Sequence, residues 1–228
     1  VAIIPLTLLL RGEGMGYKFG RDGRKINHLF FMDDLKLFGR DKEEVDKLCE
    51  VVHGFSHDIR MEFGLDKCAV LVLKTGRQTE CEGIELPEGK KIEEADERGY
   101  KYLGVLKGAD MKKKEMKEIV RREYFRRVKA VAQSKLYAGN MMRAVNGWAV
   151  SIVRYTAGVL EWKMKELKAM DIKTRKILTM NGVFHMRSSV DRVCMKRKEG
   201  GRGLISVEQC VRAEEDGLQE YAITSDEW

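Results

Sequence analysis

The stretch HLFFMDDLKLF, residues 28–38, decides how the first half of this chain is interpreted. Two adjacent aspartates, Asp33 and Asp34, separate two short runs of aromatic and aliphatic residues. This pattern predicts two antiparallel strands, 26–32 and 35–38, joined by a two-residue turn. Asp is common in tight turns, so the pair can be explained as turn residues alone. Adjacent carboxylates also repel each other, and a divalent cation relieves that repulsion, so a metal-binding pair is the alternative.

The sequence that follows predicts an α+β arrangement for the first half. Apolar residues spaced by three and four within 41–64 predict an amphipathic helix that Asp41 caps. CAVLVL, residues 68–73, is typical of a strand, and the KTGR that follows it is a turn signal. We expect a small exposed hairpin within 81–97 and another short strand at YKYLGV, residues 100–105.

The second half is predicted to be helical. An apolar stripe marks a first helix from residue 111, with Gly139 as its stop, and further helices are expected over about 140–160 and 162–180. Asn181 and Gly182 should end the last of these. KRKEGGRGLISVEQC, residues 196–210, predicts a basic Gly-rich loop that leads into a short amphipathic piece. The stripe consists of Met116, Ile119, Val120, Tyr124, Val128, Val131, Ala132 and Leu136.

Charged residues are distributed unevenly along the chain. The net charge is −3 over residues 1–110 and +10 over 111–228, and within 111–203 it reaches +16, from 24 Lys and Arg against 8 Asp and Glu. So basic a region attracts polyanions, and nucleic acid is the first candidate. Solvated helix faces are the alternative, although such faces tend to mix the two signs.

The cysteines, the histidines and the opening apolar run argue against several classes of protein. Five cysteines without a C-x-x-C spacing and four histidines that complete no zinc pattern indicate reduced intracellular thiols, mostly in the core. The opening VAIIPLTLLL, residues 1–10, is too short to span a membrane and lacks the flanks of a signal peptide. No membrane partner is therefore expected. Because the chain opens inside an apolar run, we expect a fragment of a longer protein, with an exposed apolar patch and poor solubility.

Four segments in order resemble conserved boxes of one enzyme family. The Met-Asp-Asp stretch, INHLFFMDDLKLF, resembles the motif C turn of reverse transcriptases, and MEFGLDKCAVLVL resembles their motif D loop. GYKYLGV resembles the motif E strand, and EGGRGLISVE completes the set. Together they are similar to the reverse transcriptases of non-LTR, LINE-type retrotransposons, over residues 26–208.

The resemblance implies a function and a division of roles. The family copies an RNA template into DNA from a primer with deoxynucleotide triphosphates and Mg²⁺, in this case at nuclear DNA, although the chain shows no clear targeting signal. Residues 1–110 would be part of the palm, 111–182 a helical thumb, and 183–228 a Gly-rich loop and extension. Asp33 and Asp34 would be metal ligands, Lys67 the residue that protonates or orients pyrophosphate, and Tyr102, Leu103 and Gly104 the primer grip.

The thumb would hold the template–primer duplex through its phosphates, which Lys and Arg neutralise without reading sequence. The candidate contacts are Lys112, Lys113, Lys114, Arg121, Arg122, Lys173, Arg175, Lys176, Lys196, Arg197 and Lys198.

The sequence also departs from the family pattern. The first ten residues resemble the end of the motif B helix, which would place the third metal-binding aspartate, on motif A, before residue 1. Asp22 lies in an RDG turn and does not replace it, and Gly64 stands where the motif D loop often has Asn. We therefore expect no polymerase activity from this chain alone. A non-enzymatic nucleic-acid-binding module is the alternative.

Overall fold

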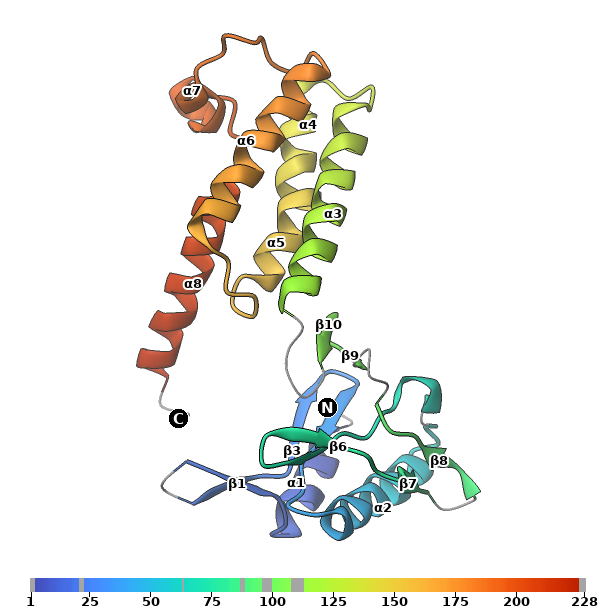
Figure 1. Ribbon diagram of the computed structural model, residues 1–228. Coiled ribbons are helices and arrows are strands. Elements are labelled where there is room, and N and C mark those ends of the chain that lie inside the picture. Colours follow the sequence, from blue (N-terminus) through green and yellow to red (C-terminus); the bar gives the residue numbers. More distant parts are fainter. Residues whose placement is uncertain are drawn as a thin grey trace. The chain divides into compact units, whose positions relative to one another are not determined.

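The computed structural model describes residues 3–20, 23–62, 64–86, 89–95, 100–107 and 113–225, with only the backbone at 100, 101, 106 and 107. The chain forms two compact units, residues 1–111 and 112–228 (Figure 1). This division lies one residue from the expected boundary at 110/111. Residues 183–228, expected as a separate segment, belong to the second unit. The α+β class holds, with helices and antiparallel strand pairs in the chain.

The first unit combines helices with short hairpins. Within the described residues each strand pairs only with its neighbour in sequence, so five separate two-stranded sheets form in place of one large sheet. Its elements are α1 (Ile4–Gly12), β1 (Tyr17–Phe19), β2 (Arg24–Ile26), β3 (His28–Phe31), β4 (Asp34–Leu37), α2 (Lys42–Asp58), the 3₁₀ turn η1 (Leu65–Lys67), β5 (Val72–Lys74), β6 (Arg77–Thr79), β7 (Ile84–Glu85), β8 (Lys91–Ile92), β9 (Tyr100–Tyr102) and β10 (Val105–Lys107).

Helix α2 organises the core of this unit. Asp41 caps it as predicted, because its carboxylate accepts a hydrogen bond of 3.0 Å from the amide of Glu44. Leu48 and Val52 of α2 pack with α1 and with the β3–β4 hairpin. The adjacent Cys49 belongs to a second cluster, whose other buried residues are Ile84, Leu86 and Ile92. One helix therefore holds hairpins on two sides.

The second cluster corrects the prediction for residues 81–97. A hairpin does form there, from β7 and β8, but it is not an exposed one. Ile84, Leu86 and Ile92 are almost completely buried. Burial raises the pKa of the neighbouring Cys49 thiol to about 11, which keeps it protonated at neutral pH. Of the five free cysteines, Cys49 and Cys210 are buried and the other three are half-buried.

The second unit is a bundle of helices. Its elements are α3 (Lys113–Ala132), α4 (Ala138–Ala144), the π-helical turn η3 (Val145–Ala149), α5 (Val150–Thr156), α6 (Met164–Met180), α7 (Val190–Cys194), the 3₁₀ turn η4 (Arg197–Glu199) and α8 (Val207–Thr224). Helix α3 packs against α5 and α6, and α8 packs against the same two helices (Figure 1).

Several predicted boundaries in this unit need correction. Helix α3 ends at Ala132, so Leu136 is exposed and Gly139 lies inside α4 rather than at a helix stop. The segment after the Gly-rich loop is a full helix of 18 residues, not a short piece. The predicted end of α6 is confirmed, since Asn181 is its C-cap and its side chain donates to the carbonyl of Ile177 at 2.8 Å.

A buried hydrogen bond joins helices α3 and α6. The Tyr124 hydroxyl of α3 lies 2.9 Å from the Thr174 hydroxyl of α6. Thr174 in turn donates to the Met170 carbonyl at 2.8 Å, so Tyr124 is the donor to Thr174. Both side chains are almost completely buried.

We expect Tyr124→Phe to destabilise the chain by about 1–2 kcal/mol, because it leaves a buried hydroxyl oxygen without its donor. Urea denaturation followed by far-UV circular dichroism measures this loss. Tyr221→Phe is the matched control, since Tyr221 is exposed on α8. Equal stability of the two variants would contradict the prediction.

Candidate functional site

The β3–β4 hairpin places the two aspartates differently from the prediction. Phe31 pairs with Asp34, so the turn residues are Met32 and Asp33, and Asp34 is the first residue of β4. The predicted Asp33–Asp34 turn is therefore wrong by one residue. Phe30 pairs with Leu35 and both pack against the core, which fixes this register although Met32 must adopt a φ of 52°.

Both carboxylates are open to solvent. Asp33 and Asp34 are exposed, and neither accepts a hydrogen bond or forms an ion pair with another described residue. Exposed carboxylates that no cation neutralises are hard oxygen ligands suited to Mg²⁺, which keeps several waters and takes one or two protein carboxylates together with substrate phosphates. Among the described residues, no three His, Cys, Asp or Glu side chains lie close enough to form a complete metal cage.

A second hairpin replaces the single strand expected at residues 100–105. Tyr102 ends β9 and Val105 begins β10, with Leu103 and Gly104 as the turn between them. Their φ angles of 48° and 76° suit a tight hairpin turn, in which both central residues need positive φ. The buried Val105 anchors the hairpin. The residues expected to grip a primer thus form the tip of this hairpin.

Strand β4 contacts the second hairpin through a side chain of its middle. The Lys36 ammonium of β4 lies 5.6 Å from the centre of the Tyr102 ring and 5.1 Å from that of Phe38. Burial raises the pKa of the Tyr102 hydroxyl, and the negative charge of Asp34 raises it further. Lys36 was not among the predicted residues, although its position two after Asp34 places both on one face of the strand.

Lys67 lies apart from this pair in the contacts that the structure describes. It is exposed at the end of η1, while the neighbouring Leu65 packs against the core cluster around Cys49. No described contact joins Lys67 to Asp33 or Asp34. Gly64 is the N-cap of η1, where an added side chain would be in ordinary contact with the Asp66 carboxylate.

The predicted phosphate contacts of the second unit fall into distinct groups. Lys113 is paired with Glu161, and Arg121 with Glu118 and Glu166, so their charge is partly neutralised. Lys114, Arg122, Lys176, Lys196, Arg197 and Lys198 are exposed and form no ion pair with a described residue, whereas Arg175 is half-buried. Lys112 lies outside the described residues.

Basic side chains of α3 and α6 line a shallow groove of about 430 Å³. Phe125 forms its floor, with the Lys173 ammonium 4.3 Å from the centre of the ring. Arg126 is partly neutralised by Glu123, whose pKa falls to about 2 because Arg126 and Arg127 donate to its carboxylate. The remaining lining residues are Glu118, Arg121, Arg122 and Lys129. The prediction missed Arg126 and Lys129, although both follow Arg122 at helical spacing.

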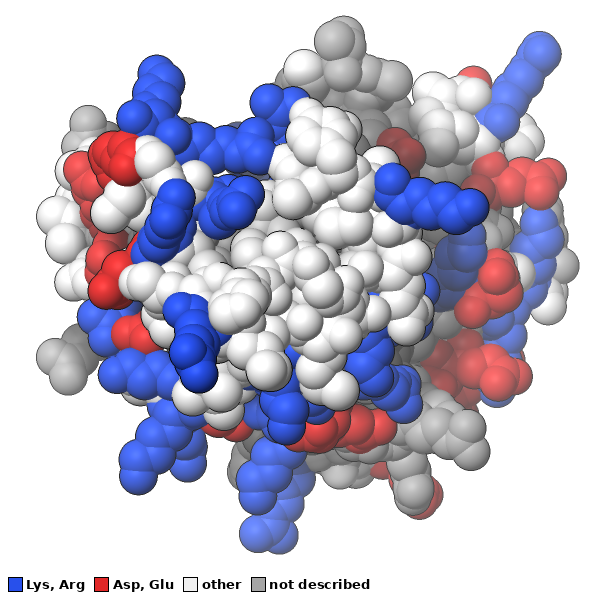
Figure 2. Space-filling model, turned by 90° about the horizontal axis from the view of Figure 1, so that it is seen from above, with Lys and Arg blue, Asp and Glu red and all other residues white. Residues whose placement is uncertain are grey.

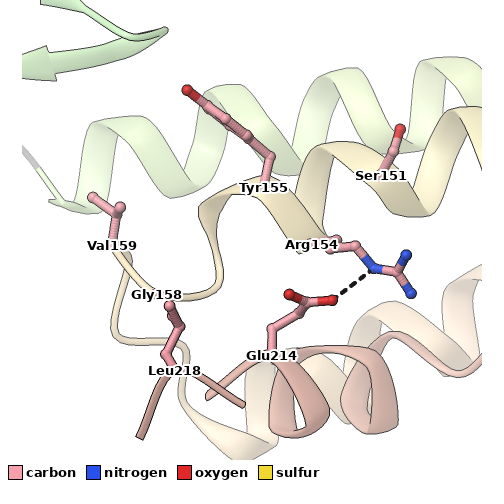
Figure 3. Close-up of a pocket in the computed structure, with 7 residues that line it drawn as sticks. All are labelled: Ser151, Arg154, Tyr155, Gly158, Val159, Glu214 and Leu218. Carbon is pink, nitrogen blue, oxygen red and sulfur yellow. Dashed lines mark ion pairs between the residues drawn. The ribbon is translucent and has the colours of Figure 1, made fainter. Parts of the chain in front are cut away.

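A larger cavity of about 620 Å³ lies between α5 and α8 (Figure 3). Several of its polar groups are already paired with other groups of the protein. Arg154 points toward Glu214, and the two form an ion pair of 3.0 Å. Ser151 donates to the carbonyl of Trp148 in its own helical run. Gly158 and Leu218 close one end, where a side chain at Gly158 would overlap Leu218. The polar groups here serve packing.

Comparisons with protein-family models, with curated proteins and with solved structures find no match for this chain. Over the described residues, no helix combines the length and the apolar character that crossing a membrane requires. The assignment of function therefore depends on the chemistry of the residues and on the sequence motifs.

The contact between the hairpins can be tested through Tyr102. Asp34→Asn should lower the pKa of the Tyr102 hydroxyl, because it removes a negative charge that opposes phenolate formation, while the contribution of burial remains. NMR titration of the ring carbon bearing the hydroxyl, assigned with Tyr102→Phe, measures the shift. Asp33→Asn is the control and should leave it unchanged. A shift with Asp33→Asn but none with Asp34→Asn would refute the arrangement.

Proposed function

We propose that this chain is the palm-and-thumb part of a reverse transcriptase similar to those of LINE-type retrotransposons, an RNA-directed DNA polymerase that acts in the nucleus. The observation that carries the proposal is the exposed Asp33–Asp34 pair on a hairpin whose second strand acts on Tyr102 through Asp34 and Lys36. The motif order in the sequence and the basic helical unit support it. The finer assignment of residues to palm and thumb belongs to this proposal.

In this proposal each group of predicted site residues has a separate role in nucleotidyl transfer. Asp33 and Asp34 would hold Mg²⁺, which stabilises negative charge on phosphate oxygens when bound. Tyr102, Leu103 and Gly104 would support the primer end, since their turn is held against β4 through Lys36. Lys67 would orient the departing pyrophosphate. The α3–α6 groove would bind phosphates of the RNA–DNA duplex through exposed Arg122 and Lys129.

A second candidate follows from the number of acidic ligands at the hairpin. Two carboxylates without a third acidic ligand cannot fix two metal ions at once. A non-enzymatic nucleic-acid-binding module is therefore the second candidate. The two candidates differ in whether metal and a deoxynucleotide triphosphate bind at the hairpin.

Metal binding separates the candidates without relying on activity. Mn²⁺, used in place of Mg²⁺ together with a deoxynucleotide triphosphate, should broaden the NMR signals of Asp33, Asp34 and Tyr102 in the unmodified chain. The double variant Asp33→Asn, Asp34→Asn should abolish this broadening, because amides replace the anionic ligands. Broadening that survives in the double variant would assign the metal elsewhere and leave the binding module. We expect no primer extension by the chain alone, and robust synthesis on an RNA template would refute that expectation.

Duplex binding tests the thumb. Arg122→Gln with Lys129→Gln should weaken binding to an RNA–DNA duplex about tenfold and lower the slope of log K against log salt by about 2, since two phosphate contacts are lost. Fluorescence anisotropy across a salt series measures both quantities. Lys165→Gln with Lys168→Gln removes equal charge from exposed sites on α6 outside the groove and should have little effect. No binding at low salt would refute the assignment.

A further inference from the structure

One end of the second unit exposes apolar side chains among basic ones. The connections from α3 to α4 and from α6 to α7 lie at this end (Figure 1). Segments 133–144 and 181–203 carry eight Lys and Arg against two Asp and Glu. Figure 2, in which this end is nearest, shows Lys and Arg around a patch of other side chains. Met186 is 88% exposed, Met180 76% and Tyr137 65%. We refer to this surface as the basic end.

The Gly-rich loop at the basic end has a defined backbone. The amide of Gly201 donates to the carbonyl of Lys196 at 3.0 Å, and the amide of Gly203 donates to that of Met195 at 2.9 Å. A side chain at Gly201 would overlap the Met195 carbonyl, so only glycine allows this closure. The loop is therefore folded back on itself, and Lys196 and Lys198 are displayed from a fixed base.

Two polar side chains fasten the end of the loop to the helices. Asn146 of η3 donates to the Gly203 carbonyl at 2.7 Å and accepts from the Ile205 amide at 3.0 Å. Asp171 of α6 accepts from the Val207 amide and the Ser206 hydroxyl, both at 2.7 Å, which caps α8. The position of the loop is thus set by α6 and by the η3 turn. A fixed loop loses less entropy on binding than a free one.

An aromatic ring and a guanidinium lie side by side at this end. A side chain at Gly139 would overlap both the Tyr137 ring and the Arg197 guanidinium, so these two groups border the same glycine. The Tyr137 side chain is largely exposed. Base faces stack on exposed aromatic rings and on guanidinium planes.

We propose that the basic end binds single-stranded nucleic acid, at a site separate from the α3–α6 groove. Lys196, Lys198 and Arg202 contact phosphates, and Tyr137 and Arg197 take an unstacked base. A duplex presents phosphates but hides its base faces, so it would leave Tyr137 and the methionines uncovered, whereas a single strand covers both kinds of side chain. The inference deepens the proposed function, and depends on it only for the choice of nucleic acid among polyanions.

Three matched variants of the full chain test the proposal by fluorescence anisotropy with a mixed-sequence RNA strand and with an RNA–DNA duplex of equal length. Lys196→Gln with Lys198→Gln should weaken single-strand binding about tenfold and lower its salt slope by about 1.4, since each lost contact to a single strand contributes about 0.7. Tyr137→Ala should weaken it by a similar factor with the salt slope unchanged, because stacking releases no counterions. Lys165→Gln with Lys168→Gln is the control of equal charge.

The outcomes separate this inference from the proposed function. Loss of single-strand binding with duplex binding retained supports a separate site. Equal loss of both ligands in the Lys196 and Lys198 variant overturns it, as does a Tyr137→Ala variant that binds normally. Duplex binding without any single-strand binding overturns the inference and leaves the proposed function standing. Displacement of the RNA strand by polyaspartate at equal charge concentration would assign the surface to acidic peptides and also overturn it.

Discussion

Like-charge repulsion is the constraint on which the architecture of the helical unit depends. Residues 111–203 carry three basic side chains for every acidic one. The few carboxylates are therefore shared: Glu166 pairs with Lys117 at 2.8 Å and with Arg121 at 3.3 Å, and Glu123 serves Arg126 and Arg127. Glu166 lies on α6 and its two partners lie on α3, so this carboxylate joins two helices. The cations that remain must face solvent, because burial without a partner is costly.

A different constraint shapes the first unit. Its hairpins are short, and two-stranded hairpins alone are barely stable in water. Two of them have apolar residues packed close to the tip, Phe30 and Leu35 in β3–β4 and Val105 in β9–β10. The tips can then carry residues that contribute nothing to packing. This is why Asp33 and Asp34 can be exposed without an ion pair to any described residue, and why Met32 can be held at a positive φ.

Sequence reasoning succeeded where one local rule decides the outcome. The Asp41 cap and the end of α6 at Asn181 follow from side-chain hydrogen bonds to nearby backbone, which the sequence specifies directly. It failed where packing between distant segments decides. The tip of the β3–β4 hairpin moved by one residue because core contacts set the register, and the hairpin within 81–97 is buried because Cys49 of α2 packs against it. Neither contact is visible in the local pattern.

Gly139 shows how this failure bears on function. A glycine after an apolar stripe is typical of a helix end, yet this one lies in the first turn of α4 and is in contact with the Arg197 side chain. The aliphatic part of the Arg197 side chain also lies near Gly203, so one side chain borders two glycines that are distant in sequence. The three consecutive cations of Lys196, Arg197 and Lys198 are therefore not equivalent. All three side chains are exposed, but only Arg197 borders Gly139 and the Tyr137 ring. In the proposed site, the basic run therefore offers one group beside an aromatic ring and two lysines for phosphates.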